Sequence, residues 1–157
     1  MQPINIISTA SKQECYQSLH PQIKALLSGE SDPIANMANV AAALKEAFDF
    51  WWVGFYVVKG DMLVLGPFQG PVACTRIGYG KGVCGTAWAT GEVQIVSDVT
   101  LFPGHIACSA QSKSEIVLPV KRHETVVSVL DIDSEFLNTF DYTDQYFLQE
   151  IISLLEN

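Results

Sequence analysis

Three segments of the chain repeat apolar residues at the spacing of an α-helix. They cover residues 10–28, 31–48 and 141–157, and in each the apolar side chains fall on one face. The residues expected to cap these helices are Ser8 or Thr9, Ser31 or Asp32, and Asp141 or Thr143. Pro21 lies inside the first segment, where it is expected to kink or split the helix. The pattern predicts two helices at the start of the chain and one at its end.

Between these helices the pattern changes to short runs rich in aromatic and β-branched residues, which favour strands. The expected strands cover residues 51–58, 62–68, 71–77, 93–99 and both halves of 115–134, with turns at 59–61 and at Arg122–His123. Residues 80–92 predict a loop followed by a short helix that ends at Gly91. A loop of about 17 residues follows, from about 97 to 114, and loops of that length in compact domains are more often functional than idle.

The order of the elements predicts the fold class. Two helices precede neighbouring strands joined by short turns, and a helix closes the chain, which favours an antiparallel sheet with helices packed on one side, an α+β fold. The length of 157 residues, with 48% hydrophobic and 17% charged residues, suits one domain with one core. We therefore expect a single domain over residues 1–157.

Charge and hydropathy exclude several classes of partner. The 17 acidic residues outnumber the 9 basic ones, which gives a formal net charge of -8 and argues against nucleic acid. The most hydrophobic run, residues 51–58, is far shorter than the roughly 20 residues that span a bilayer. The N-terminus lacks the features of a signal peptide, so we expect a cytoplasmic protein. In that reducing compartment the four cysteines are more readily reactive, metal-binding or buried than paired in a structural disulfide framework.

Three cysteines fall in or beside the loops of the middle region: Cys74, Cys84 and Cys108. Cys15 lies in the first helix and is expected to pack there. The three loop thiols and His105 offer four zinc ligands, but Cys74 and Cys84 are not a close C-x-x-C pair of the kind typical of structural sites. In thiol redox chemistry, by contrast, one cysteine becomes a sulfenic acid and a second condenses with it. Spacing alone leaves redox-active and unreactive thiols equally compatible with the sequence.

Carboxylates and aromatic residues add a second candidate cluster. Glu115 begins one predicted strand, while Asp131 and Asp133 end the next and share one of its faces. The two strands flank a short turn, so the three acids are expected at the same end of the hairpin. Such a cluster binds an ammonium group, and one carboxyl kept protonated by its neighbours donates a proton; the plainer interpretation is a solvated strand end. Trp52 and Tyr56 share a strand face and form a pocket wall or ordinary core.

The glycine-rich run GYGKGVCG, residues 78–85, invites comparison with a phosphate-binding loop. It lacks the Lys-Ser/Thr ending of a P-loop. The glycines instead let the backbone bend closely around a small ligand or another loop, or they form a flexible turn.

Three long segments together resemble the free methionine-(R)-sulfoxide reductases, which are built on the GAF fold. They read GPVACTRIGYGKGVCGTAW, DVTLFPGHIACSAQSKSEIVLPV and VSVLDIDSEFLNTFDYTD. The resemblance extends from residue 51 through the terminal helix and, more loosely, over the first two helices. It implies a GAF-like domain that reduces free L-methionine (R)-S-oxide with electrons from thioredoxin, with no bound cofactor and no metal.

The resemblance also implies roles for individual residues. It implies that Cys108 attacks the substrate, that Cys74 is the main resolving cysteine and that Cys84 is an alternative partner. It implies that Glu115, Asp131 and Asp133 contact the substrate. Trp52 and Tyr56 are implied to form the pocket wall. Glu115 or one of the aspartates is expected to protonate the departing oxygen. Acids near Cys108 raise the pKa of its thiol, and His105 and Lys113 are candidates to offset this effect.

The alternative class is a non-catalytic GAF domain that senses a small ligand, and a zinc-stabilised structural domain is a third. The sensor predicts ligand binding without turnover. A homodimer is expected by analogy with GAF domains that pair through their terminal helices.

Overall fold

The computed structural model describes residues 3–6, 11–106 and 108–156, and within these ranges the chain forms four α-helices, six strands and a 3-10 helix. The helices are α1 (Lys12–Leu27), α2 (Pro33–Phe48), α3 (Gly82–Thr90) and α4 (Tyr142–Ser153). The strands are β1 (Trp52–Lys59), β2 (Met62–Gln69), β3 (Arg76–Gly78), β4 (Gln94–Val96), β5 (Ser114–Arg122) and β6 (Thr125–Ser134), and η1 spans Val99–Leu101. None of these helices combines the length and the apolar character that a membrane span requires.

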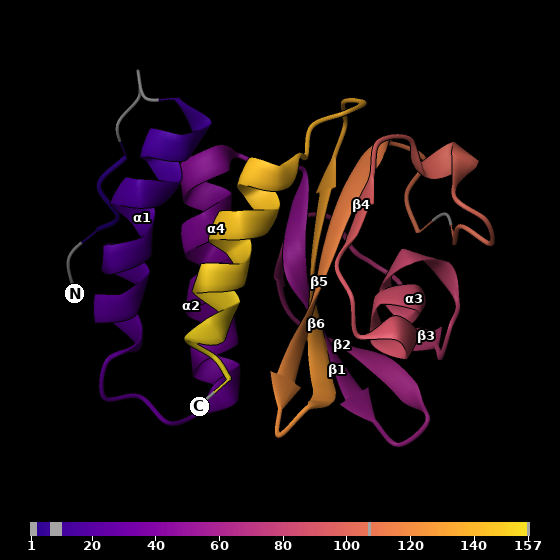
Figure 1. Ribbon diagram of the computed structural model, residues 1–157, viewed down its shortest axis with the longest axis horizontal. Helices are drawn as coiled ribbons and strands as arrows, with labels where there is room; N and C mark the ends of the chain where they lie inside the picture. The colour runs from indigo at the N-terminus through magenta and orange to yellow at the C-terminus, as the bar shows by residue number, and fades with distance from the viewer. Residues whose placement is uncertain (1–2, 7–10, 107, 157) are drawn as a thin grey trace.

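The strands form one sheet in the order β3-β2-β1-β6-β5-β4, and every neighbouring pair is antiparallel. Helices α2 and α4 cover one face of this sheet, and α1 packs outside them (Figure 1). The predicted α+β fold is confirmed. The short helix α3 lies on the opposite face, together with the loops that flank it, so this face is also covered (Figure 1).

The alternation of side chains along each strand divides the core into two parts. In β1, Val53 and Phe55 belong to the core beneath the long helices, whereas Trp52 and Tyr56 belong to the core beneath α3. The helix-side core also contains Ile116, Leu118, Leu130 and Ile132, while Val117 and Val129 lie on the α3 side. The residues of β5 and β6 that alternate with the helix-side core therefore face α3.

Each of the three long helices begins after a side chain that accepts hydrogen bonds from first-turn N–H groups: Ser11 in α1, Asp32 in α2 and Asp141 in α4. The prediction is confirmed for α2 and α4, where one of two candidate caps acts. Ser8 and Thr9, the caps expected for the first helix, lie outside the described residues.

The structure corrects the sequence prediction at several element boundaries. Helix α1 is continuous through Pro21, so the predicted split is wrong; the carbonyl that loses its partner belongs to Gln17, which is exposed at the surface. The β5–β6 turn lies one residue later than predicted, at His123 and Glu124, whose positive φ angles of 48° and 66° match a two-residue hairpin turn. Strand β3 covers residues 76–78, whereas residues 71–77 were predicted to be extended, and β4 covers only residues 94–96 of the predicted 93–99.

Candidate active site

Pairing of three strands brings the acidic residues together. Glu115 of β5 and Trp52 of β1 lie directly opposite Asp133 of β6, one on each side. Asp131 lies two residues earlier in β6, on the same face, which is the face toward α3. The expectation that the three carboxylates share one end of the hairpin is confirmed by this register, which follows from the tight turn at the other end.

A disulfide joins the two loops above this end of the sheet. Cys74 lies between β2 and β3, Cys108 lies between β4 and β5, and their sulfur atoms are 2.03 Å apart. Their Cα atoms are 5.6 Å apart although 34 residues separate them in the chain. The zinc alternative required both sulfurs as ligands together with Cys84 and His105, and this bond removes them from that set.

A cavity lies beneath the disulfide, between the sheet and α3. It encloses about 640 Å³ of empty space when its open mouth is included. The predicted site residues that line it are Trp52, Tyr56, Cys84, Cys108, Glu115, Asp131 and Asp133. The remaining one, Cys74, is bonded to Cys108, so the structure brings all the predicted site residues to one place.

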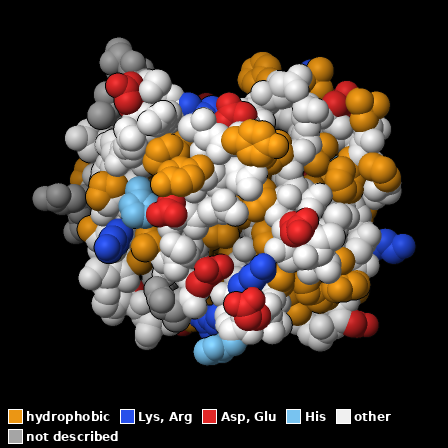
Figure 2. All heavy atoms as spheres, in the orientation of Figure 1, with side chains coloured by type: hydrophobic (Ala, Val, Ile, Leu, Met, Phe, Trp, Pro, Cys, Tyr) orange, Lys and Arg blue, Asp and Glu red, His pale blue; other side chains and the backbone are white. Residues whose placement is uncertain are grey.

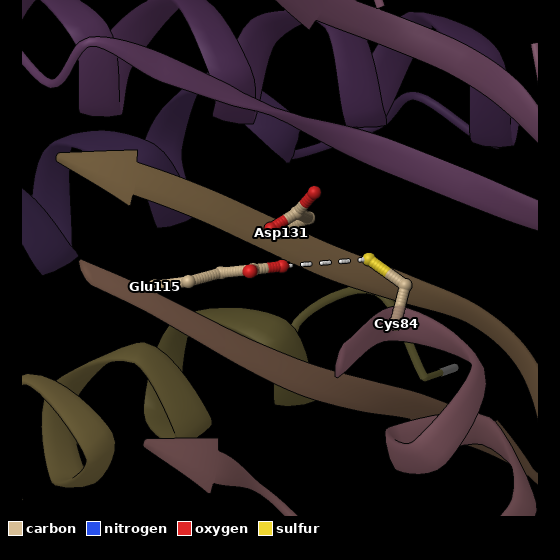
Figure 3. Close-up of side chains that lie close together, drawn as sticks. All are labelled: Cys84, Glu115 and Asp131. Atoms are coloured by element: carbon tan, nitrogen blue, oxygen red, sulfur yellow. Dashed lines mark hydrogen bonds between the residues drawn. The ribbon is translucent and has the colours of Figure 1, made fainter. Parts of the chain in front are cut away.

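Cys84 points from α3 toward the carboxylates of β5 and β6 (Figure 3). Its sulfur lies 3.9 Å from Glu115 Oε1 and donates a weak hydrogen bond to it. Asp131 lies beside the pair, and its buried Oδ1 atom has no hydrogen-bond partner among the described residues. One ligand atom from each of these three residues lies within 4.8 Å of the others. An unpartnered buried oxygen is free to accept a hydrogen bond from a donor that enters the cavity.

Burial shifts the protonation of this cluster. It raises the pKa of Asp131 to about 6, although the nearby Glu115 carboxyl and Cys84 thiol oppose the shift. Burial and the nearby aspartates raise the pKa of Glu115 well above its ordinary value. Burial and Asp131 do the same to the pKa of Asp133. Burial and the carboxylates also raise the pKa of the Cys84 thiol, so the thiol stays protonated at neutral pH and the carboxyls hold their protons more tightly than solvated ones do.

The aromatic residues of β1 hold the segment that carries Cys74. The Tyr56 hydroxyl donates a hydrogen bond of 2.9 Å to the backbone oxygen of Cys74, and Trp52 Nε1 donates one of 3.1 Å to the oxygen of Pro71. The two rings stack with their centroids 5.9 Å apart. These residues therefore line the cavity with their rings and anchor the segment of residues 71–74 with their polar atoms.

The glycine-rich run positions Cys84 by close backbone packing. Gly80 and Gly82 adopt φ angles of 70° and 60°, which other residues rarely adopt. A Cβ atom on Gly85 would lie 2.5 Å from the backbone oxygen of Gly78, so only glycine lets the start of α3 approach β3 this closely. This contact lies within the run itself, so the glycines form a close turn between β3 and α3.

Ser112 is a site residue that the sequence analysis missed. It lines the cavity, and its hydroxyl donates a hydrogen bond to Asp133 Oδ1. It lies in the loop with Cys108, and a lone serine in a long loop gives no pattern that would single it out. His105 lines the cavity as expected, but burial lowers the pKa of its imidazole, which therefore stays neutral at pH 7 and does not supply the offsetting positive charge that the sequence suggested.

The fold and the arrangement of the site match one class of protein. The sequence profile of the GAF domain family matches residues 32–157. A GAF domain of a phosphotransferase from Coxiella burnetii shares the fold at 17% identity and a TM-score of 0.82, with 92% of this chain and 93% of that chain covered. The protein is a GAF domain.

More similar relatives narrow the family. Free methionine-R-sulfoxide reductase of Escherichia coli is 47% identical over 93% of this chain and 89% of its own length, and that of Saccharomyces cerevisiae is 40% identical over 97% and 89%. A crystal structure of free methionine-R-sulfoxide reductase from Neisseria meningitidis in complex with its substrate has a TM-score of 0.96 at 50% identity, covering 99% of this chain and 94% of that one. The chain belongs to the free methionine-R-sulfoxide reductase family of GAF domain enzymes, which are oxidoreductases.

Proposed function

We propose that this protein reduces free L-methionine (R)-S-oxide to L-methionine by cysteine chemistry at Cys108. The observation that carries the proposal is the pairing of Cys74 with Cys108 over a cavity lined by three carboxylates. The family supports the substrate, because the relative from Neisseria meningitidis was crystallised with its substrate and one from Staphylococcus aureus likewise.

The reaction proceeds in two steps on the reduced enzyme. The Cys108 thiolate attacks the sulfoxide sulfur, and with one proton the oxygen passes to Cys108, which becomes a sulfenic acid while methionine leaves as the sulfide. The Cys74 thiol then attacks the sulfenic sulfur, the S–S bond forms, and the oxygen leaves as water. The oxidised product of this sequence is the disulfide seen in the structure.

The carboxylates select the free amino acid. Asp131 has a buried oxygen without a hydrogen-bond donor, and Glu115 and Asp133 lie beside it. A free amino acid supplies an ammonium group that donates to these oxygens, whereas methionine within a polypeptide has none to offer. An ionised carboxylate that is buried without a counter-charge has a much higher free energy than a solvated one. A peptide-bound substrate would leave the carboxylates in that state, so the cavity discriminates against it.

Glu115 supplies the proton for the departing oxygen. Burial and its acidic neighbours raise its pKa well above the ordinary value and so favour the protonated form, and protonated carboxyl groups act as general acids. The bound ammonium group then offsets the negative charge of the aspartates. It thereby makes loss of the Cys108 proton easier when substrate is bound, so the thiolate forms more readily in the complex than in the substrate-free enzyme.

Cys84 holds Glu115 in place and remains a thiol. Its sulfur is buried, donates to Glu115, and has a raised pKa, so it is a poor nucleophile in this state. The bonded pair in the structure is Cys74 with Cys108, which supports Cys74 as the resolving cysteine. A thioredoxin-type dithiol reduces the disulfide to complete the cycle, and no bound cofactor is needed.

A coupled assay with NADPH, thioredoxin reductase and thioredoxin tests this function. The expected result is turnover of free (R)-sulfoxide, with free (S)-sulfoxide and peptide-bound methionine sulfoxide slower by at least about a hundredfold. Cys108→Ser is expected to abolish turnover, and the matched variant Cys15→Ser, in the half-buried α1 thiol on the other side of the sheet, is expected to retain it. Equal rates for the free and peptide-bound (R)-sulfoxides would contradict the proposal.

A further inference from the structure

Exposed apolar side chains flank the disulfide on both of the segments that carry it. Val72 is two residues before Cys74 and 91% of its surface is exposed. Ile106 is two residues before Cys108 and 39% exposed. Both line the mouth of the cavity. Apolar side chains also gather over the end of the molecule formed by α3 and the neighbouring loops (Figure 2). Apolar surface that surrounds a reactive bond is typical of an interaction site.

Two exposed residues near the disulfide carry positive charge, the opposite sign to the net charge of the protein. Lys81 is exposed and lines the mouth of the cavity, and exposed Arg76 follows Cys74 by two residues. These are two of only nine basic residues in a chain of net charge -8. A partner that approaches here meets positive charge locally, whereas the rest of the protein repels an acidic molecule.

We propose that Val72, Arg76, Lys81 and Ile106, here called the rim, form the docking surface for the protein dithiol that reduces the Cys74–Cys108 bond. The partner is a thioredoxin-type protein whose reactive cysteine lies in apolar surface flanked by carboxylates. This inference rests on the proposed function, because that function forms the disulfide in each turnover.

The exchange step defines what the rim must do. A partner thiolate attacks one sulfur of the bond and displaces the other cysteine as a thiolate, which takes up a proton. The partner's second thiol then attacks the mixed disulfide, so the partner's own disulfide forms and both Cys74 and Cys108 become thiols, with the two electrons supplied by the partner. Attack occurs along the S–S axis, so a protein partner must cover the surface on either side of the bond, where Val72 and Ile106 lie. A small dithiol reaches the bond without covering it.

The test compares thioredoxin with dithiothreitol as reductant in Val72→Gln. A neutral polar side chain removes the apolar contact without changing the charge near the disulfide. The expected result is a KM for thioredoxin raised at least about fivefold, as for a contributing interface residue, while the rate with dithiothreitol stays at the wild-type value. Val72→Leu is expected to retain the wild-type KM. The matched control is Ile34→Gln, at a 54% exposed aliphatic residue on α2, across the sheet from the rim, which should leave both rates unchanged.

A second readout separates the docking surface from the proposed function. Oxidised enzyme is mixed with reduced thioredoxin in the absence of substrate, and loss of the disulfide is followed by stopped flow. Slower reduction of Val72→Gln than of wild type supports the rim. The docking surface is contradicted if thioredoxin reduces the variant at the wild-type rate. It is also contradicted if reduction by dithiothreitol slows to the same extent as reduction by thioredoxin. If wild-type enzyme yields no methionine from the free sulfoxide, the proposed function fails, and the substrate-free rates still decide the docking surface.

Discussion

Asp131 is a buried acid that favours substrate binding but lowers the stability of the substrate-free protein. Burial raises its pKa to about 6 from an ordinary value of 3.8, so the folded protein holds this proton more tightly than the unfolded chain does. The free energy of unfolding therefore decreases as the pH rises between these two values and stays at the lower level above them. A substrate ammonium group removes the cost by giving the charge a partner.

Asp131→Asn is expected to stabilise the substrate-free protein at pH 8. The amide carries no charge, so the free energy of unfolding should rise by about 1–3 kcal/mol at pH 8 and change much less at pH 4. Urea unfolding at the two pH values measures this difference. The same variant should raise the KM for free methionine sulfoxide by at least about tenfold, since it loses a charged partner of the ammonium group. A variant that is less stable at pH 8 would contradict the explanation.

Ser112 adjusts the charge of Asp133 through one hydrogen bond. Donation from the hydroxyl favours the ionised carboxylate and so opposes the burial that raises the pKa of Asp133. The same contact ties the loop that carries Cys108 to β6. No periodic pattern marks this serine in the sequence, because its partner becomes adjacent only when the loop folds over the sheet.

Ser112→Ala is expected to raise the pKa of Asp133 further and to shift the pH dependence of the substrate KM toward higher pH. At pH 7 the KM should increase by about threefold to tenfold, and the difference from wild type should decrease as the pH rises, because higher pH favours the ionised Asp133 without help from the hydroxyl. Ser112→Thr retains the hydroxyl and should behave like wild type. Steady-state rates over this pH range provide the measurement. A KM raised equally at every pH would indicate a purely structural role for the hydroxyl.

One buried acid of α4 connects this helix to α1. Asp144 is 1% exposed, accepts hydrogen bonds of 2.9 Å from the Tyr16 hydroxyl and 2.6 Å from Lys12 Nζ, and so connects α4 to α1. The boundaries of both helices were predicted to within a few residues, and Asp141 was predicted as a candidate cap of α4, because these features depend on local chemistry. This contact joins residues 128 positions apart, and a helical pattern does not contain that information.

Asp144→Asn is expected to lower the free energy of unfolding by about 2–4 kcal/mol, since it leaves Lys12 facing an amide and removes an ion pair whose carboxylate is buried. The matched control is Asp49→Asn, which breaks the Lys45–Asp49 pair at a 97% exposed side chain and should cost less than about 1 kcal/mol. Chemical denaturation of the reduced proteins provides both values. Both substitutions lie across the sheet from the cavity, so kcat should be unchanged. Equal costs for the two variants would contradict the assigned importance of Asp144.

The disulfide links the two edges of the whole sheet. Cys74 precedes edge strand β3, and Cys108 follows edge strand β4 at the opposite side. The sequence pattern predicted the α+β fold, the antiparallel hairpins and the gathering of three acids, because these follow from the period of the apolar residues and from the length of the turns. The edge strands were predicted too long, since their ends are set by the loops that fold over α3. Which thiols meet was implied by family resemblance and not by spacing.

Reduction of the disulfide is expected to lower the stability of the whole domain. Closing a loop of 34 residues restricts the unfolded chain, and the oxidised protein should be more stable by about 2–4 kcal/mol. Thermal unfolding with and without dithiothreitol measures this as a clear decrease in Tm on reduction. Cys74→Ser should show the low Tm under both conditions. A wild-type Tm that does not respond to reductant would mean that the bond does not constrain the fold.

A single-turnover experiment tests directly whether the substrate oxidises Cys108 and whether Cys108 then forms a disulfide with Cys74. Fully reduced enzyme is mixed with one equivalent of free methionine (R)-sulfoxide and no reductant, and methionine and the thiols are counted by mass spectrometry. The account predicts one methionine per chain and a disulfide between Cys74 and Cys108, with Cys15 and Cys84 still reduced. It also predicts that Cys74→Ser still yields one methionine but retains a sulfenic acid on Cys108. Methionine formation by Cys108→Ser, or loss of the Cys84 thiol in place of Cys74, would contradict it.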